Sequence, residues 1–271
     1  MTELRPPQPK PAGPTADPSL VGLVARGVID AELAALVWVL VEARVPLIVA
    51  APVDRVGAGG QLLAGIIGSI HPDEPVEQLV GPLTAAGASN LVRGRRAGGV
   101  VEAGSLEEVR QRLGGGPMPL SEDQLTFLGC VLVVGEATDG RRGRLRVTAA
   151  HYVRPLARDA HGHSQRLDPA VLAAWDGRLE RYEHFAWGVL PEIAARLGRR
   201  TGDLEADIHH RRDDLGGLAK AGVTEIGEVR RLIAGYRVRW GDGHTGADHG
   251  SGDHAGPHLE PHAEGPGHQP H

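Results

Sequence analysis

The pattern of apolar and polar positions predicts an α/β region that begins near residue 30. Apolar residues recur every three to four positions between residues 33 and 41, which predicts an amphipathic helix that Asp30 caps and that ends near residue 44. After Pro46, the run PLIVAAP is almost wholly apolar, as in a strand buried inside a parallel sheet. A glycine-rich loop and then a helix in QLLAGIIGSI are expected to follow.

The next part of the chain predicts a second helix and a hairpin. Residues 71–98 are rich in Pro, Gly and Arg, and we expect them to be irregular. Ser105 and Glu108 form the spacing of a capping box, which predicts a helix in GSLEEVRQRLG. A strand over residues 128–134, the turn TDGRRGR and the returning strand RLRVTAAHYVRPL predict an antiparallel hairpin at one edge of the sheet.

From residue 169 onwards the pattern indicates helices. One is expected after Pro191 with a stop at Gly198, one from a cap at Thr201 to Gly222, and one after a cap at Thr224. We therefore divide the chain into a Pro-rich disordered leader (1–18), an α/β core (19–168), a C-terminal helical region forming a small bundle (169–240) and a His-rich disordered tail (241–271).

Composition narrows the classes of function. The net charge of -5 and the pI of about 6.3 argue against nucleic acid as the main partner. A single cysteine, Cys130, excludes an internal disulfide framework and a cysteine-based zinc site, and its apolar surroundings predict a buried strand thiol. The apolar stretch from residue 31 to 50 contains charged residues and is divided by Pro46, so we predict no membrane span and a cytoplasmic protein.

The glycine-rich loop has the position of a phosphate-binding loop but not its chemistry. In the phase of the motif G-x-x-x-x-G-K-[ST], Asp54 stands at the first Gly, Gly60 at the Lys and Gln61 at the Ser/Thr. The candidate nucleotide-binding residues are Asp54, Gly57, Gly59, Gly60 and Gln61. One interpretation is a residual anion site made by backbone N–H groups. The other, which we favour because Asp54 competes with phosphate, is a simple strand-to-helix connection.

The order of these pieces resembles the ATPases of type II and type IV secretion and pilus assembly, in their archaeal-type branch. LAALVWVLVEARVPLIVAAP is similar to the family's helix and strand that enter Walker A, and GGVVEAGSLEEVRQRL to its TxHAxSxxExxxRL segment. LTFLGCVLVVGEATDGRRGRLRVTAAHYV resembles its apolar strand, arginine-rich turn and returning strand, and HHRRDDLGGLAKAGVTEIGEVRRLIAGY its C-terminal helices. The resemblance spans residues 19–237. It implies a RecA-like, P-loop-derived parallel sheet with an antiparallel edge hairpin, and hexameric assembly at the cytoplasmic side of a membrane machine.

The chain departs from this family at the residues that carry catalysis. Gly60 cannot supply the P-loop cation, Gln61 is a poor Mg²⁺ ligand and Asp54 is anionic. Glu102 replaces the family's His, and residues 71–99 contain no apolar strand that ends in Asp or Glu. We therefore predict a non-hydrolysing homologue with no catalytic residues, acting as an accessory or regulatory subunit in a homo-oligomer or with a motor ATPase. An alternative is a protein that binds ATP weakly and turns it over slowly.

Histidine and arginine clusters give further hypotheses. The tail could make the chain a metal-binding protein for Zn²⁺ or Ni²⁺, or serve only as a solubilising segment. Its candidate ligands are His244, His249, His254, His258, His262, His268 and His271. Glu205 and His209 have i, i+4 metal spacing, with an exposed polar face as the favoured interpretation. Arg93, Arg95 and Arg96 are either a phosphate-contacting cluster, an inter-subunit arginine finger or, as we favour, solvated charge. The same interpretation is favoured for Arg141, Arg142 and Arg144 in the hairpin turn.

Overall fold

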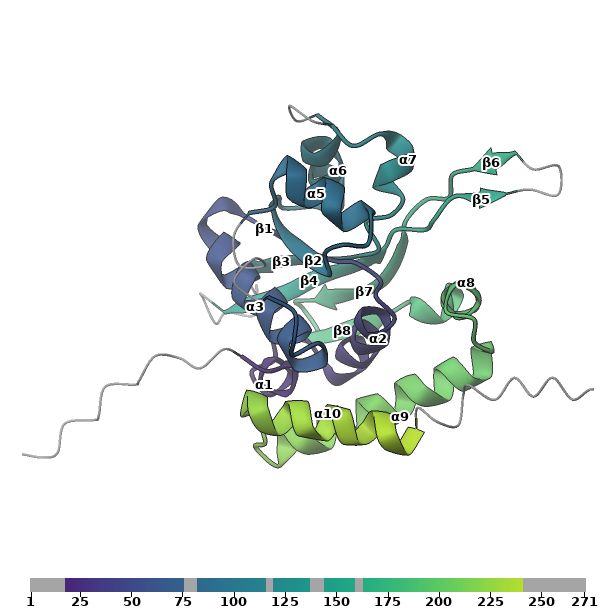
Figure 1. Cartoon of the computed structure of the whole chain (residues 1–271). Coiled ribbons are helices and arrows are strands. Elements are labelled where there is room, and N and C mark those ends of the chain that lie inside the picture. The colour runs from purple at the N-terminus through teal and green to yellow at the C-terminus, as the bar shows by residue number, and fades with distance from the viewer. Residues whose placement is uncertain (1–17, 76–81, 116–118, 137–143, 159–162, 241–271) are drawn as a thin grey trace, which may run out of the picture. The chain divides into compact units, whose positions relative to one another are not determined.

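A computed structural model describes residues 18–75, 82–115, 119–136, 144–158 and 163–240 of the chain (Figure 1). The chain divides into two units, residues 1–235 and 236–271, and the described part of the second unit is the end of the last helix. The predicted leader, apart from residue 18, and the whole His-rich tail lie outside the described residues.

A six-stranded sheet forms the centre of the first unit, with the strand order β2-β1-β3-β4-β7-β8. The strands are β1 (Leu47–Ala51), β2 (Gly98–Glu102), β3 (Cys130–Glu136), β4 (Leu145–Tyr152), β7 (Ala170–Asp176) and β8 (Arg181–His184). Strands β2, β1 and β3 are parallel, and β4, β7 and β8 continue the sheet in antiparallel fashion. A separate two-stranded ribbon pairs β5 (Ala157–Arg158) with β6 (Ser164–Gln165). The α/β class and the parallel core are confirmed.

The predicted strand in PLIVAAP is the central strand of the parallel part. Every residue of β1 is buried, as its continuous apolar run indicates. Leu47 is aligned with Gly98 of β2 and with Cys130 of β3, so the carboxyl ends of the three strands meet at one edge of the sheet. Cys130 is a buried strand thiol, as expected, and its burial raises the pKa of the thiol to about 12.

Helices α1 (Leu20–Ala25), α2 (Ala31–Glu42) and α3 (Val56–Ile70) lie together on one side of the sheet (Figure 1). The cap predicted for α2 is confirmed, because an Asp30 carboxylate oxygen accepts from the Leu33 N–H at 2.9 Å. Helix α3 packs directly on β1 and β2. Among the helices of the described ranges, none combines the length and the hydropathy that crossing a membrane requires.

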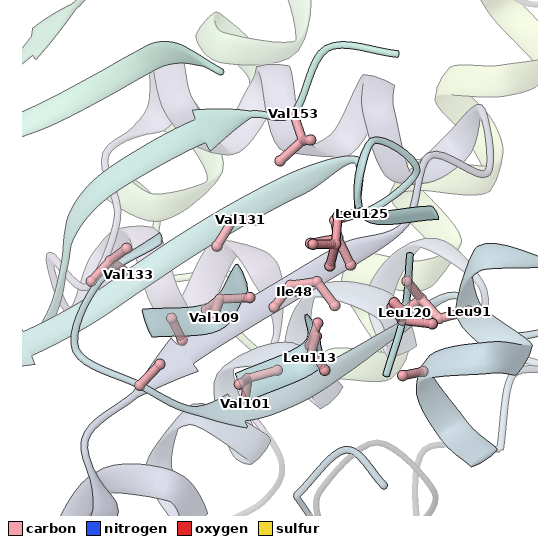
Figure 2. Close-up of a cluster of buried hydrophobic side chains, with 14 residues drawn as sticks. Ile48, Leu91, Val101, Val109, Leu113, Leu120, Leu125, Val131, Val133 and Val153 are labelled. Atoms are coloured by element: carbon pink, nitrogen blue, oxygen red, sulfur yellow. The ribbon is translucent and has the colours of Figure 1, made fainter. Parts of the chain in front are cut away.

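Helices α5 (Ala85–Val92), α6 (Leu106–Gly114) and α7 (Glu122–Leu125) cover the opposite face of the parallel strands. Figure 2 shows side chains from these helices meeting Ile48, Val101 and Val131 of the strands in one apolar cluster. The α6 cap is confirmed, since the Ser105 hydroxyl accepts from the Glu108 N–H at 3.2 Å. The expectation that residues 71–98 are irregular is wrong for α5 and for the start of β2. The Pro, Gly and Arg residues of this segment masked both elements.

The sheet extends beyond the predicted boundary of the core. Residues 169–184 were expected to open a helical region, but they form β7 and β8. Hairpin β3–β4 is confirmed as an antiparallel pair, whereas its predicted edge position is wrong because β7 pairs with β4. The physical reason is that β4 has a second unsatisfied row of backbone groups, which the later strands pair.

The C-terminal helices follow a short 3-10 turn, η2 (Ala186–Gly188), and are α8 (Leu190–Arg196), α9 (Thr201–Lys220) and α10 (Ile226–Trp240). Two of the predicted caps are wrong. Thr201 is the first residue of α9 rather than its cap, and the Glu225 carboxylate, not Thr224, accepts from the N–H groups of Gly227 and Glu228. These hydrogen bonds lower the pKa of Glu225.

A buried charge network holds α9 against α2. Asp207 accepts from Arg199 at 2.6 Å and from Arg211 at 2.8 Å, and all three side chains are largely shielded from solvent. The Arg211 guanidinium also lies 4.5 Å from the ring centre of Trp38 on α2 and pairs with Glu42 at the end of that helix. The C-terminal helices therefore pack on the N-terminal ones through α9.

Candidate functional site

The carboxyl edge of the parallel strands is the first place to look for a ligand site. The chain leaves β1 through α3 and α5 to reach β2 on one side, and leaves β2 through α6 and α7 to reach β3 on the other side. Ligands of α/β sheets bind where such connections diverge, outside the carboxyl ends of the strands. The residues at this point are the turn after β1, the start of α3 and the last residue of β3, Glu136.

The prediction of a glycine loop is wrong, because a helix occupies these residues. A short 3-10 turn, η1 (Val53–Arg55), leads straight into α3 at Val56. Gly57, Gly59, Gly60 and Gln61 therefore lie in the first two turns of that helix, and none of the three glycines has a positive φ. The predicted site residues are thus neighbours on one helix rather than a loop that wraps a phosphate.

Gly59 has a packing role at this position. A Cβ atom added there would lie 3.0 Å from the Cβ of Ala51 and 3.2 Å from a methyl group of Val49, both on β1. The missing side chain lets α3 approach the strand closely. Gly57 faces solvent, where an added Cβ would meet no atom within 4 Å, and Gly60 is buried. The glycine run therefore contributes a close contact between helix and strand.

An ion-pair bridge crosses the point where the connections diverge. The Arg55 guanidinium lies 3.2 Å from a Glu136 carboxylate oxygen at the end of β3, and 3.3 Å from the Asp54 carboxylate. At the end of β2, Glu102 pairs with Arg112 of α6 at 3.0 Å. These pairs are solvent-exposed and add little stability. The two pairs of Arg55 nevertheless place its guanidinium, beside the start of α3, between two carboxylates.

Sequence reasoning missed Arg55, Glu136 and the strand that ends in Glu102. The expectation of no apolar strand ending in an acid concerned residues 71–99, whereas β2 starts in that range at Gly98 and ends beyond it at Glu102. The available signal was an acidic residue directly after each apolar run, in GGVVE and in CVLVVGE. Pairing of Glu136 with Arg55 could not be read from residues 81 positions apart.

The arginine cluster of residues 93–96 lies at the opposite edge of the sheet. Arg96 donates to the carbonyl oxygen of Gly98, the first residue of β2, at 2.7 Å, and its burial lowers the pKa of the guanidinium. Arg93 and Arg95 are exposed. Because β1 and β2 are parallel, this amino end is a full strand length away from the start of α3. The structure therefore separates these arginines from the predicted nucleotide-binding residues of the same chain.

The other candidates divide between surface positions and residues beyond the described ranges. Glu205 and His209 are exposed on α9, as the favoured interpretation expects. In the part of the chain that the structure describes, no cluster of three or more His, Cys, Asp or Glu side chains could hold a metal ion. Arg144 donates to the carbonyl oxygen of Arg26 at 2.7 Å. Arg141, Arg142 and the seven tail histidines lie outside the described residues, so the tail hypothesis stays a prediction.

Comparison with known proteins adds no family to this picture. No protein-family model matches the chain, and no curated protein matches it significantly.

Proposed function

We propose that the chain is a non-hydrolysing relative of the secretion and pilus-assembly motor ATPases, acting as an accessory or regulatory subunit at the cytoplasmic side of such a machine. In this proposal, the six-stranded sheet and the helices that cover it are a reduced RecA-like core. The observation that carries it is the junction of β1 and α3, where the helix begins at Val56 and packs on the strand through Gly59. A strand followed by a helix is the context of a P-loop, but here only Pro52 and the 3-10 turn η1 separate them.

The charges at this junction support the absence of phosphoryl transfer in the proposal. Transfer requires a cation at the β- and γ-phosphates and ligands for Mg²⁺. Position 60 is a buried glycine within the helix, and Gln61 is a neutral, exposed amide. The nearby cation, Arg55, is held by Asp54 and Glu136. An incoming triphosphate would therefore have to displace a carboxylate before it met a positive charge.

A second candidate function, weak nucleotide binding, is favoured by the uncapped start of α3. Arg55 occupies the cap position of this helix and makes no side-chain capping bond. The first N–H groups of a helix have no intrahelical acceptor, and together with the helix dipole they attract anions. Binding of this kind would need no lysine, and it is compatible with a regulatory subunit that senses nucleotide without hydrolysing it.

The experiment has two arms on the full-length chain. In the first, turnover of Mg·ATP is measured; we expect no phosphate release above a heat-inactivated control. Arg112→Gln is the matched control, because it removes the ion pair with Glu102 at the end of β2. Turnover that is lost in Arg55→Gln but kept in Arg112→Gln would overturn the proposal. In the second, the chain is added to the secretion motor ATPase of the same organism. We expect co-elution and a changed turnover rate of the motor, and the proposed accessory role fails if neither is seen.

A further inference from the structure

An open cavity of about 610 Å³ lies at the antiparallel end of the sheet, away from the junction of β1 and α3. We call it the arginine crevice. It is bounded by the connection between α1 and α2, the start of β4 and the β7–β8 hairpin. The side chains that matter for its chemistry are Asp30, Arg144, Arg146, Trp175, Arg181 and His184. Its volume is in the range of small-molecule sites.

The inner wall of the arginine crevice is a buried cation stacked on an aromatic ring. The Arg146 guanidinium lies 3.6 Å from the ring centre of Trp175, and only 8% of Arg146 is exposed. Trp175 meets Tyr182 edge to face with ring centres 5.1 Å apart. The Tyr182 hydroxyl is fixed between the carbonyl oxygens of Val147 and Val28, at 2.8 and 3.0 Å. Arg146 is therefore held in one orientation, with its charge in a region of low dielectric.

Two further arginines stand at the rim. Arg144, just before β4, and Arg181, the first residue of β8, are both exposed. Within the described ranges, neither forms an ion pair with a carboxylate. The indole N–H of Trp175 is shielded from solvent and has no hydrogen-bond acceptor among the described residues. The rim therefore supplies positive charge that no described carboxylate pairs, and Trp175 adds a donor that no described residue satisfies.

Acidic residues also line the arginine crevice, but those on its opposite wall are already engaged. One Asp30 oxygen accepts from the Leu33 N–H, and the other lies 2.8 Å from His184 Nε2. Glu32 lies 3.9 Å from His184 Nδ1. Glu180 is an exposed residue of the β7–β8 turn. Asp30 and Glu32 thus face the imidazole of His184 and the start of α2.

We propose that the arginine crevice binds a small ligand through an oxyanion group, a carboxylate or a phosphate, which Arg144, Arg146 and Arg181 hold. Guanidinium groups present paired N–H donors that match the two oxygens of such groups, and shielding from water strengthens the contact. The inference is independent of the proposed motor relationship, because no residue of the crevice belongs to the junction of β1 and α3.

The test is a calorimetric titration of the full-length chain with citrate and, separately, with inorganic pyrophosphate, at constant ionic strength with chloride as the reference anion. Trp fluorescence serves as the second readout, because Trp175 is part of the wall. We expect saturable binding of at least one of the two anions; citrate alone indicates a carboxylate ligand, and pyrophosphate alone a phosphate ligand. Saturable binding of neither anion at millimolar concentration would overturn the inference.

Rim variants locate the binding. Arg181→Gln and Arg144→Gln are each expected to weaken it about tenfold, since a charge-assisted contact is lost. Arg178→Gln is the matched control, because Arg178 is exposed in the same hairpin turn and lies outside the crevice. Equal weakening in Arg178→Gln and Arg181→Gln would contradict the assignment. All three substitutions are at exposed positions, so they test the inference without disturbing the buried Arg146.

Discussion

The two halves of the sheet differ in the kinds of side chain that fill their interiors. In the parallel half, β2, β1 and β3 are covered by helices on both faces, and the side chains that fill this interior are mainly Val, Leu, Ile and Ala. In the antiparallel half, the interior includes Arg146 and the hydroxyl of Tyr182, and His184 is paired with Asp30. The comparison teaches that apolar packing defines the first half, while the second depends on specific polar partners. We therefore expect the largest losses of stability from substitutions in the apolar interior of the parallel half.

The largest effect is expected from a cavity in the parallel half. Ile48 is fully buried in the cluster of Figure 2. Ile48→Ala should lower the free energy of unfolding by about 2–5 kcal/mol, since buried methyl groups are lost and the space is only partly refilled. Val171→Ala on β7 is the control, because Val171 is 40% exposed and should cost less than about 0.5 kcal/mol. Urea unfolding measures both, and equal costs would remove the contrast between the halves.

A polar deletion tests the antiparallel half. Tyr182→Phe keeps the ring against Trp175 but removes the hydroxyl that lies between the carbonyl oxygens of Val28 and Val147. We expect a loss of about 1–3 kcal/mol, the cost of leaving a buried polar group without its partner. Chemical denaturation gives the value. An unchanged stability would show that this half is held by its apolar contacts alone.

A pair of glycine substitutions tests the close contact in the parallel half. Gly57→Ala should stabilise the chain by up to about 1 kcal/mol, because the site is helical and open. Gly59→Ala should instead cost about 1 kcal/mol, since its Cβ would press on Ala51 and Val49. Thermal unfolding of both variants measures the difference. Destabilisation by Gly57→Ala would favour a glycine loop over the helix described here.

The smallest expected effect is a pH dependence that belongs to the antiparallel half. Burial opposes protonation of His184, but the hydrogen bond to Asp30 and the charges of Asp30 and Glu32 together outweigh it, so its pKa is raised above 6.5. The contribution to stability is complete below pH 6.5 and is lost as the pH rises through the folded-state pKa. The stability difference between the wild type and His184→Gln should therefore shrink from about pH 5.5 to 8.5.

His151 on β4 provides the opposite sign for comparison. Its burial lowers its pKa, so its neutral form is favoured in the folded chain and stability is lost as the pH falls. His151→Gln should accordingly reduce the loss of stability at low pH. If both variants changed the pH profile in the same direction, the environments assigned to the two histidines would be incorrect.

Sequence patterns predicted the elements that local signals specify. The buried run of β1, the Asp30 cap of α2 and the Ser105 cap of α6 are all encoded within a few residues. Strands β7 and β8 were missed because AVLAAWD and RYEH contain residues that also suit helices, and only pairing with β4 decides between the two.

The candidate sites were predictable only in part. Glycines cost up to about 1 kcal/mol each in a helix, which made a loop the natural prediction for residues 57–60. Close packing of α3 on β1 at Gly59 offsets this cost of glycine in a helix. Because the packing is a tertiary contact, the local sequence does not predict it. The arginine crevice brings together Asp30, Arg146 and Trp175 from three distant segments. No spacing in the sequence connects them.

The central claim is that the junction of β1 and α3 has no phosphate cradle, and a crystal structure with a non-hydrolysable ATP analogue and Mg²⁺ tests it most directly. We expect no ordered triphosphate with bound metal at the carboxyl edge of β1, β2 and β3, and the Arg55–Glu136 pair to remain in place. An ordered triphosphate at the start of α3, with Mg²⁺ held beside it and Arg55 turned onto the phosphates, would contradict the account.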